Sequence, residues 1–133
     1  MVLKNLETRN LLVPVVGDFG GPKALRAVGQ YLKDHGATVT AYYTSNVEQY
    51  LFNRGSGRGL VVNGGATKFY ENVGTLPLDA SSVFIRSGVT TQSGGRGGGN
   101  GMNKSQIAPI QATVDAYKAE KILGYNDIFF IQN

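Results

Sequence analysis

The order of apolar and polar residues along the chain predicts a series of strands. Residues 11–16 form a continuous, mainly β-branched apolar run, which is typical of a strand buried on both faces. Residues 37–44 alternate and are rich in β-branched and aromatic side chains, and residues 82–87 contain another short apolar run. Residues 128–131 are a candidate for the last strand. The pattern therefore predicts about four strands.

Between these runs, apolar residues recur at the spacing of helices. The first such segment begins at Pro22, whose fixed φ suits the first helical turn, and it ends before Gly36. Ser105 is in position to cap the last one. The predicted helices cover residues 22–35, a short segment from residue 47 that ends before Gly55, residues 66–73 and residues 106–121.

The alternation of strands and helices predicts an α/β fold. Strands joined by helices pair in parallel through right-handed crossovers, so we expect a small open, mostly parallel sheet with helices on both faces. The 133 residues fit a single domain. Glycine is concentrated in residues 55–65 and 92–104, which we expect to be loops, the second one flexible. Ligands of such sheets bind at the carboxyl ends of the strands.

Composition and charge exclude several kinds of site. The chain has no cysteine and a single histidine, so we expect neither disulfides nor thiol nucleophiles, and no metal cofactor. The net charge of +4 is spread along the whole chain, which argues against nucleic-acid binding. No apolar run approaches the roughly 20 residues of a membrane span, and the first residues lack the pattern of a leader. We therefore expect a soluble, cytoplasmic protein without a membrane partner.

Four blocks of sequence carry a family resemblance. They are residues 12–29 (LVPVVGDFGGPKALRAVG), 36–52 (GATVTAYYTSNVEQYLF), 69–79 (FYENVGTLPLD) and 82–87 (SVFIRS). In their order and spacing, these blocks resemble the carboxyl-terminal half of an uncharacterised bacterial family with a Rossmann-like, S-adenosylmethionine-dependent methyltransferase fold. The resemblance implies that residues 1–133 form one truncated methyltransferase-like α/β domain.

The resemblance also implies what this chain lacks. It makes residues 11–16, 37–44 and 82–87 the third, fourth and fifth strands of the methyltransferase sheet. The first two strands, with the Gly-rich loop that binds the methionine part of the cofactor, have no counterpart here. A partner chain would then supply the missing half of an S-adenosylmethionine site.

Asp18 and the glycines around it form the first candidate binding site. At the end of a predicted strand, this carboxylate could accept hydrogen bonds from a ribose or an adenine amino group, or it could cap the helix that follows. The resemblance implies that the turn containing Asp18, Phe19 and Gly20 lines the adenine end of the pocket. The backbone donors of Gly20 and Gly21 are also a candidate anion site, although a tight turn explains these glycines equally.

The turn after the next strand holds the second candidate site. Methyltransferases place polar residues that face the substrate in this turn. The resemblance also makes Ser45 and Asn46 candidate cofactor ligands. Asn46 would orient a nucleophile and Glu48 would accept a proton, which makes these two the catalytic candidates. The alternative is structural, because Ser45 and Glu48 have the spacing of a capping box. Arg86, at the end of a later strand, is expected to form an internal ion pair, with Asp79 as one possible partner.

Two functions from different classes remain open on these residues. The first is a methyltransferase-like domain that binds S-adenosylmethionine, or a related nucleotide, together with a partner chain. The second is a non-enzymatic assembly module, since an unpaired apolar strand at residues 11–16 invites pairing with another chain, including a second copy across a twofold axis. A nucleotide- or phosphate-binding protein that uses residues 17–21 is a third possibility.

Overall fold

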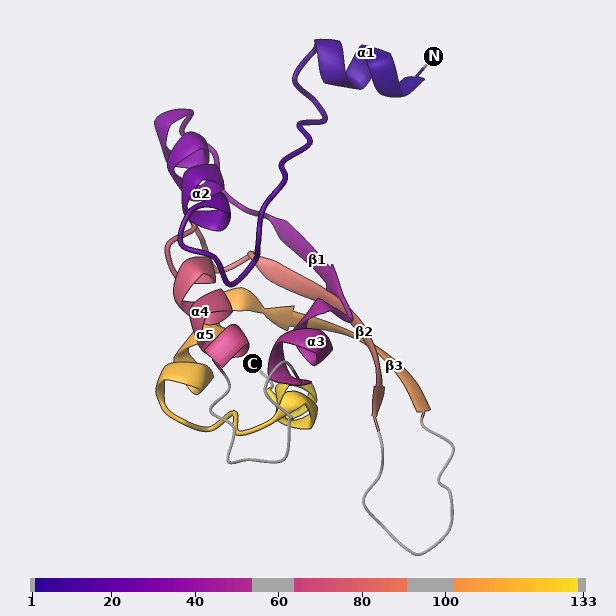
Figure 1. Cartoon of the computed structure of the whole chain (residues 1–133), viewed down its shortest axis with the longest axis vertical. Coiled ribbons are helices and arrows are strands. Elements are labelled where there is room, and N and C mark those ends of the chain that lie inside the picture. The colour runs from indigo at the N-terminus through magenta and orange to yellow at the C-terminus, as the bar shows by residue number, and fades with distance from the viewer. Residues whose placement is uncertain (1, 54–63, 91–101, 132–133) are drawn as a thin grey trace, which may run out of the picture.

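A computed structural model of the chain describes residues 2–53, 64–90 and 102–131. The elements, in chain order, are α1 (Val2–Thr8), α2 (Ala24–Asp34), β1 (Ala41–Ser45), α3 (Val47–Asn53), α4 (Gly64–Val73), β2 (Val83–Thr90), β3 (Met102–Pro109), α5 (Ile110–Lys118) and the 3₁₀ helix η1 (Tyr125–Phe130) (Figure 1). No helix among these described residues is both long enough and apolar enough to cross a membrane.

The described strands form one small open sheet in the order β1-β2-β3. β1 pairs with β2 in parallel, whereas β3 is antiparallel to β2. The register between β1 and β2 slips after Tyr43, and Ser45 has a positive φ of 50° at the end of the strand. The mixed α/β class is confirmed. The sheet differs from the prediction, since the described part has three strands, one of them antiparallel, in place of about four mostly parallel ones.

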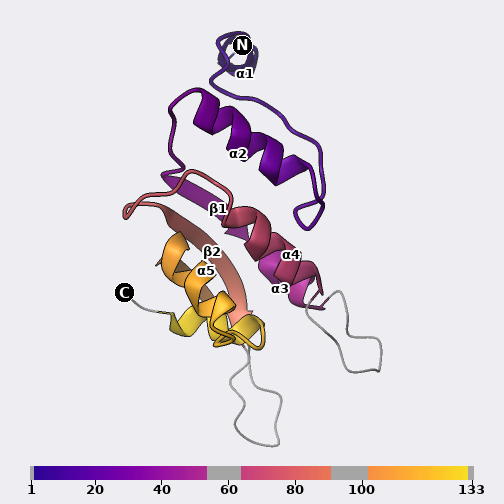
Figure 2. The same cartoon turned by 90° about the vertical axis from the view of Figure 1, so that its left-hand side faces the viewer.

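The core lies on one face of this sheet. Helices α3, α4 and α5 and the 3₁₀ helix η1 lie on that side in Figures 1 and 2. Phe69 of α4 is fully buried there, and its ring centroid lies 6.0 Å from that of Tyr42 on β1 and 6.3 Å from that of Phe84 on β2. Such offset and edge-on aromatic pairs are favourable beyond the area that they bury. This cluster joins the sheet to its helical layer.

The opposite face of the sheet has no helix on it among the described residues. Tyr43, Ile85 and Ile107 point to that face, and all three side chains are exposed. We expected helices on both faces, but α2 packs on α4, with Arg26 bonded to Asn72, and so belongs to the same helical layer. The described helices therefore complete only one of the two layers of an α/β fold.

The prediction of a buried strand at residues 11–16 is wrong. This segment runs from α1 to the loop before α2 without a strand partner in the described part of the chain, and its apolar side chains are exposed (Figure 1). Pro14 lacks a donor for ladder hydrogen bonds. In addition, β1 pairs with β2 and with no other described strand, so residues 11–16 gain no neighbour there.

The predictions for the last third of the chain also need correction. Residues 106–109, expected in a helix capped by Ser105, belong to β3, where Ser105 pairs with Ser87. The helix begins only after Pro109, because pairing with β2 outweighs the local helical spacing. Residues 128–131, expected to be a strand, lie mostly in the 3₁₀ helix η1.

The remaining predicted elements agree with the structure. Helices α2, α3 and α4 are confirmed within a few residues, as are the strands β1 and β2. The predicted loop at residues 55–65 lies mostly outside the described residues, and its last two residues begin α4. The predicted flexible loop at residues 92–104 also lies mostly outside them, and residues 102–104 belong to β3.

Candidate functional site at the carboxyl ends of the parallel strands

β1 and β2 run in parallel, and β1 ends at Ser45, opposite Arg86 of β2. Ser45 Oγ lies 3.1 Å from Ser87 Oγ of β2, which continues beyond this point to Thr90. The positive φ of Ser45 turns the chain sharply from β1 into α3, so that Glu48, in the first turn of α3, points back into the core. The capping box expected between Ser45 and Glu48 is therefore not formed, since both side chains bond elsewhere.

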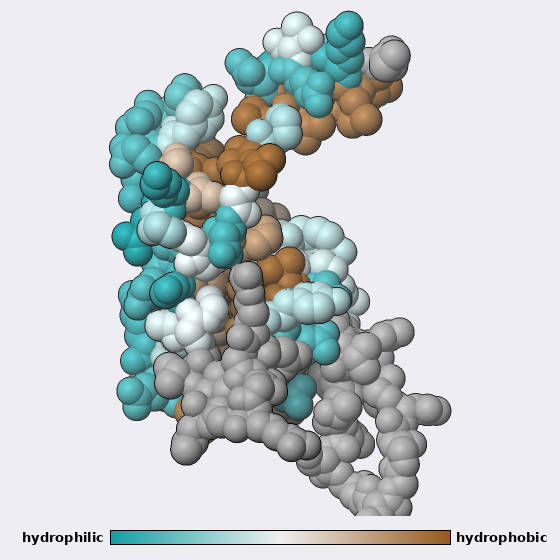
Figure 3. All heavy atoms as spheres, in the orientation of Figure 1, coloured by the Kyte–Doolittle hydropathy of each residue, from teal (hydrophilic) through white to brown (hydrophobic). Residues whose placement is uncertain are grey.

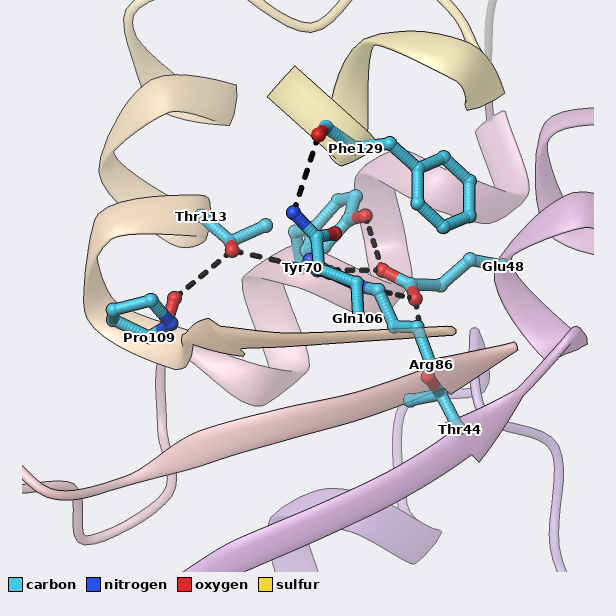
Figure 4. Close-up of polar contacts among 8 residues, drawn as sticks. All are labelled: Thr44, Glu48, Tyr70, Arg86, Gln106, Pro109, Thr113 and Phe129. Atoms are coloured by element: carbon cyan, nitrogen blue, oxygen red, sulfur yellow. Dashed lines mark hydrogen bonds and ion pairs between the residues drawn. The ribbon is translucent and has the colours of Figure 1, made fainter. Parts of the chain in front are cut away.

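Glu48 forms a buried ion pair with Arg86 of β2 (Figure 4). Arg86 Nε donates to Glu48 Oε2 at 2.7 Å, Nη2 donates to Oε1 at 3.0 Å, and both side chains are only 1% exposed. The carboxylate also accepts hydrogen bonds from the Tyr70 hydroxyl at 2.5 Å and from Thr44 Oγ1 at 3.1 Å. The prediction of an internal ion pair for Arg86 is confirmed, but the partner is Glu48 rather than Asp79.

On the side away from Glu48, the Arg86 guanidinium makes only part of the hydrogen bonds that it could donate. Its Nη2 donates weakly to Thr113 Oγ1 of α5 at 3.4 Å, and its central carbon lies 4.4 Å from the centroid of the Phe84 ring. The Nη1 nitrogen is buried and has no hydrogen-bond partner among the described residues. Gln106 pairs with Arg86 in the β ladder, and its Oε1 is likewise buried without a partner, while its Nε2 donates to the carbonyl of Phe129 at 3.2 Å.

The charge of Glu48 also acts on the tyrosines around it. Burial, and then the Glu48 carboxylate, raise the pKa of Tyr70 well above its ordinary value of 10.0. The same two causes raise the pKa of Tyr42 and of Tyr125. The tyrosine hydroxyls therefore stay protonated and neutral at neutral pH. Glu48 is thus surrounded by donors and lies out of reach of a ligand at the surface, which favours a structural role for this catalytic candidate.

The predicted binding loop at residues 18–21 sits on α4. Asp18 Oδ1 accepts a hydrogen bond from the Gly20 amide at 2.9 Å and so closes its own turn, in place of the predicted cap on α2. Asn72 Nδ2 donates to the carbonyls of Phe19 at 3.0 Å and Gly21 at 2.8 Å. Because Asn72 is 2% exposed, this amide fastens the loop to the helical layer.

The structure places the two predicted groups of ligands on different elements. The Asp18 loop rests on α4 through Asn72, whereas Ser45 and the half-buried Asn46 lie at the strand ends. Asp79, the other acid considered for Arg86, closes a separate turn. Hydrogen bonds from Ser81 and then from Ser82 lower the pKa of Asp79.

Sequence reasoning missed two features of this region. One is Asn72, whose amide lies among apolar residues on the buried face of α4. A polar residue on an apolar helix face was the only sign of it in the sequence. The other is a pocket of about 430 Å³ beside α4 and α5, in which Tyr70 stacks on Tyr117 at a centroid distance of 4.7 Å. The lining residues are Thr67, Tyr70, Glu71, Val114, Tyr117, Lys118, Glu120, Ile122 and Leu123.

Within the described parts of the chain, no group of three acidic or histidine side chains is arranged to hold a metal ion.

Comparison with known proteins identifies one family. Residues 2–118, from α1 to the end of α5, match the model of a family described as a domain of unknown function (DUF7790). The matched region includes all three described strands and the Arg86–Glu48 ion pair. A search of curated proteins found no match.

Replacing Arg86 should show how much the fold depends on the buried ion pair. We expect Arg86→Met to lower the free energy of unfolding by about 3–5 kcal/mol, because Glu48 is left buried without its counter-charge. Adding Glu48→Gln should recover part of this loss, since the second change removes the unpaired charge. Urea denaturation measures both effects. The exposed Lys68→Met is the control, with an expected change within about 0.5 kcal/mol. An equal effect of Arg86→Met and Lys68→Met would contradict the prediction.

The raised pKa of Tyr70 predicts a loss of stability at high pH. Below pH 10 the hydroxyl is protonated in the folded and unfolded chain alike, whereas above pH 10 only the unfolded chain releases the proton. The free energy of unfolding should therefore fall by about 1.4 kcal/mol per pH unit for each such buried tyrosine. Tyr70→Phe should reduce this slope by about 1.4 kcal/mol per pH unit, the contribution of one buried tyrosine. Urea titrations between pH 9 and pH 11 measure the slope. An unchanged slope would show that Tyr70 titrates normally in the folded state.

Proposed function

The chain belongs to the DUF7790 family, a domain of unknown function, and we propose that it is an assembly module that joins copies of itself through its amino-terminal arm. The arm comprises residues 2–16, that is, α1 and the extended segment that follows it. The observation that carries the proposal is the row of exposed apolar side chains along this arm. No catalytic step is part of the proposal.

The apolar surface of the arm is large for a chain that stays alone. Seven large apolar side chains of the arm are exposed, and Val16 is fully so. They are Val2, Leu3, Leu11, Leu12, Val13, Val15 and Val16. In Figure 3, hydrophobic residues gather on the underside of the arm, toward the hollow between α1 and the body. Each of these seven residues is between 42% and 101% exposed, whereas monomers rarely expose contiguous apolar patches larger than about 300–600 Å².

The helix in the arm also needs a surface to pack against. α1 has seven residues, none of them buried, and it projects from the body (Figure 1). Isolated helices shorter than about 12 residues are marginal in water, because too few hydrogen bonds offset the cost of nucleation. Packing of its apolar side on another chain would stabilise this helix. The free edge of β1, which pairs only with β2 among the described strands, offers a further place for contact.

A second candidate function is binding of S-adenosylmethionine at the strand ends. The parallel pairing of β1 and β2 favours it, since it brings the hydroxyl of Ser87 on β2 beside that of Ser45 at the carboxyl end of β1, where α/β sheets bind ligands. Under the methyltransferase-like hypothesis, Asp18, Phe19 and Gly20 contact the adenosine, and Asn46 faces the substrate. A partner chain supplies the remaining strands of that site.

A charge in the arm should weaken self-association without unfolding the chain. We expect Val15→Asp to raise the dissociation constant of the oligomer at least about tenfold, because the carboxylate loses water when the arm is buried. Gel filtration with light scattering over a range of concentrations measures this. Tyr50→Asp, at an exposed position on α3, is the matched control and should leave association unchanged. Equal behaviour of the two variants would remove the arm from the proposal.

Calorimetric titration tests the second candidate. If the strand-end hypothesis holds, S-adenosylmethionine at about millimolar concentration releases heat on binding, and Asp18→Ala weakens binding about tenfold by removing an acceptor for the adenosine. Asp34→Ala, at an exposed acid near the end of α2, is the control. Thermal melts of both variants show whether the fold is intact. Absence of heat with the unaltered chain would contradict this candidate.

A further inference from the structure

The uncovered face of the sheet carries a continuous apolar row. Tyr43 of β1 lies opposite Ile85 of β2, and Ile85 lies opposite Ile107 of β3. The three side chains are 65%, 37% and 71% exposed, respectively. Cross-strand neighbours on one face stand only about 5 Å apart, so the row spans the full width of the described sheet. An apolar row across one face of this sheet is therefore open to solvent.

This surface is incomplete for the type of sheet to which it belongs. Parallel strands such as β1 and β2 are normally covered on both faces, because their crossover helices pack on either side. Here the helices α3, α4 and α5 lie on one side, and the opposite side is bare among the described elements (Figure 1). The bare face therefore needs a covering layer with an apolar side. An amphipathic helix usually provides such a layer.

The arm has the complementary property. In α1, Val2, Leu3 and Leu6 share one side at helical spacing, and Val2 and Leu3 are well exposed. Within the residues that the structure describes, each chain thus carries a helix without a sheet to pack on, and a sheet face without a helix. In Figure 1, α1 lies at one end of the molecule, away from β2 and β3, so this helix does not cover the sheet of its own chain.

The area is sufficient for a stable dimer. The seven arm residues and the row of three expose on the order of 1,100 Å² per chain, so burial of about three quarters of it would reach the roughly 800 Å² per partner of a standard interface. A twofold axis would bury both surfaces of both chains at once. We infer that the face formed by Tyr43, Ile85 and Ile107 receives the amino-terminal arm of a second copy, in a reciprocal exchange. This inference rests on the proposed assembly function and names the surface that the arm contacts.

Engineered disulfides test this contact directly, because the native chain contains no cysteine. One preparation carries Leu3→Cys and the other, with an affinity tag of different mass, carries Ile107→Cys. Both positions are exposed, so the fold should tolerate them. A disulfide requires the two Cα atoms to approach within about 7 Å. After mixing and mild oxidation, we expect the mixed disulfide to exceed that of a control pair at least about tenfold. The control is Leu3→Cys with Gln111→Cys, at an exposed position of α5 on the helical side.

The outcomes separate this inference from the assembly function. A dimer with selective cross-linking, weakened about tenfold by Ile107→Asp, supports both. A dimer that needs the arm but cross-links no better than the control overturns the docking surface and leaves the assembly function standing. A chain that stays monomeric in sedimentation overturns both. Because Ile107 is exposed, loss of dimer in Ile107→Asp with an unchanged thermal melt reports the interface rather than the fold.

Discussion

The buried ion pair between Glu48 and Arg86 is the interaction on which the described fold most depends. An unpaired charge in a protein interior is costly, so each of these side chains fixes the place of the other. Glu48 comes from the first turn of α3, Arg86 from β2, and their further partners Tyr70 and Thr113 from α4 and α5. One polar cluster thus sets how three helices sit on the sheet (Figure 4).

This cluster also decides what the strand ends offer. In an α/β protein the carboxyl ends of the strands are the expected ligand site, but here Glu48 turns inward and its carboxylate is occupied by donors. The polar residues left nearer the surface are Ser45, Asn46 and Ser87. Of the fifteen large apolar residues that are exposed in the described parts of the chain, seven lie along the arm and three on the other sheet face. The other five, Phe19, Tyr31, Tyr50, Leu123 and Phe130, do not belong to either surface. An assembly role follows from that distribution of surface.

Local pattern predicted much of the fold and little of the site. Helix α2 and strand β2 were recognisable because their apolar spacing agrees with their final packing. Residues 11–16 look like a buried strand, yet burial depends on a neighbour that the described chain does not supply. Residues 106–109 have helical spacing but pair with β2, a long-range contact that no local window contains. The Glu48–Arg86 pair likewise joins positions 38 residues apart. The amide of Asn72 bonds to carbonyls more than 50 residues away along the chain.

The central claim is that this chain completes its hydrophobic layers with a second copy. Sedimentation equilibrium of the unaltered chain over a wide range of concentrations measures this most directly. The account predicts that the mass rises from 14.2 kDa toward twice that value as concentration increases, and then stops rising, because a twofold exchange is closed. A mass of 14.2 kDa at every concentration would contradict it.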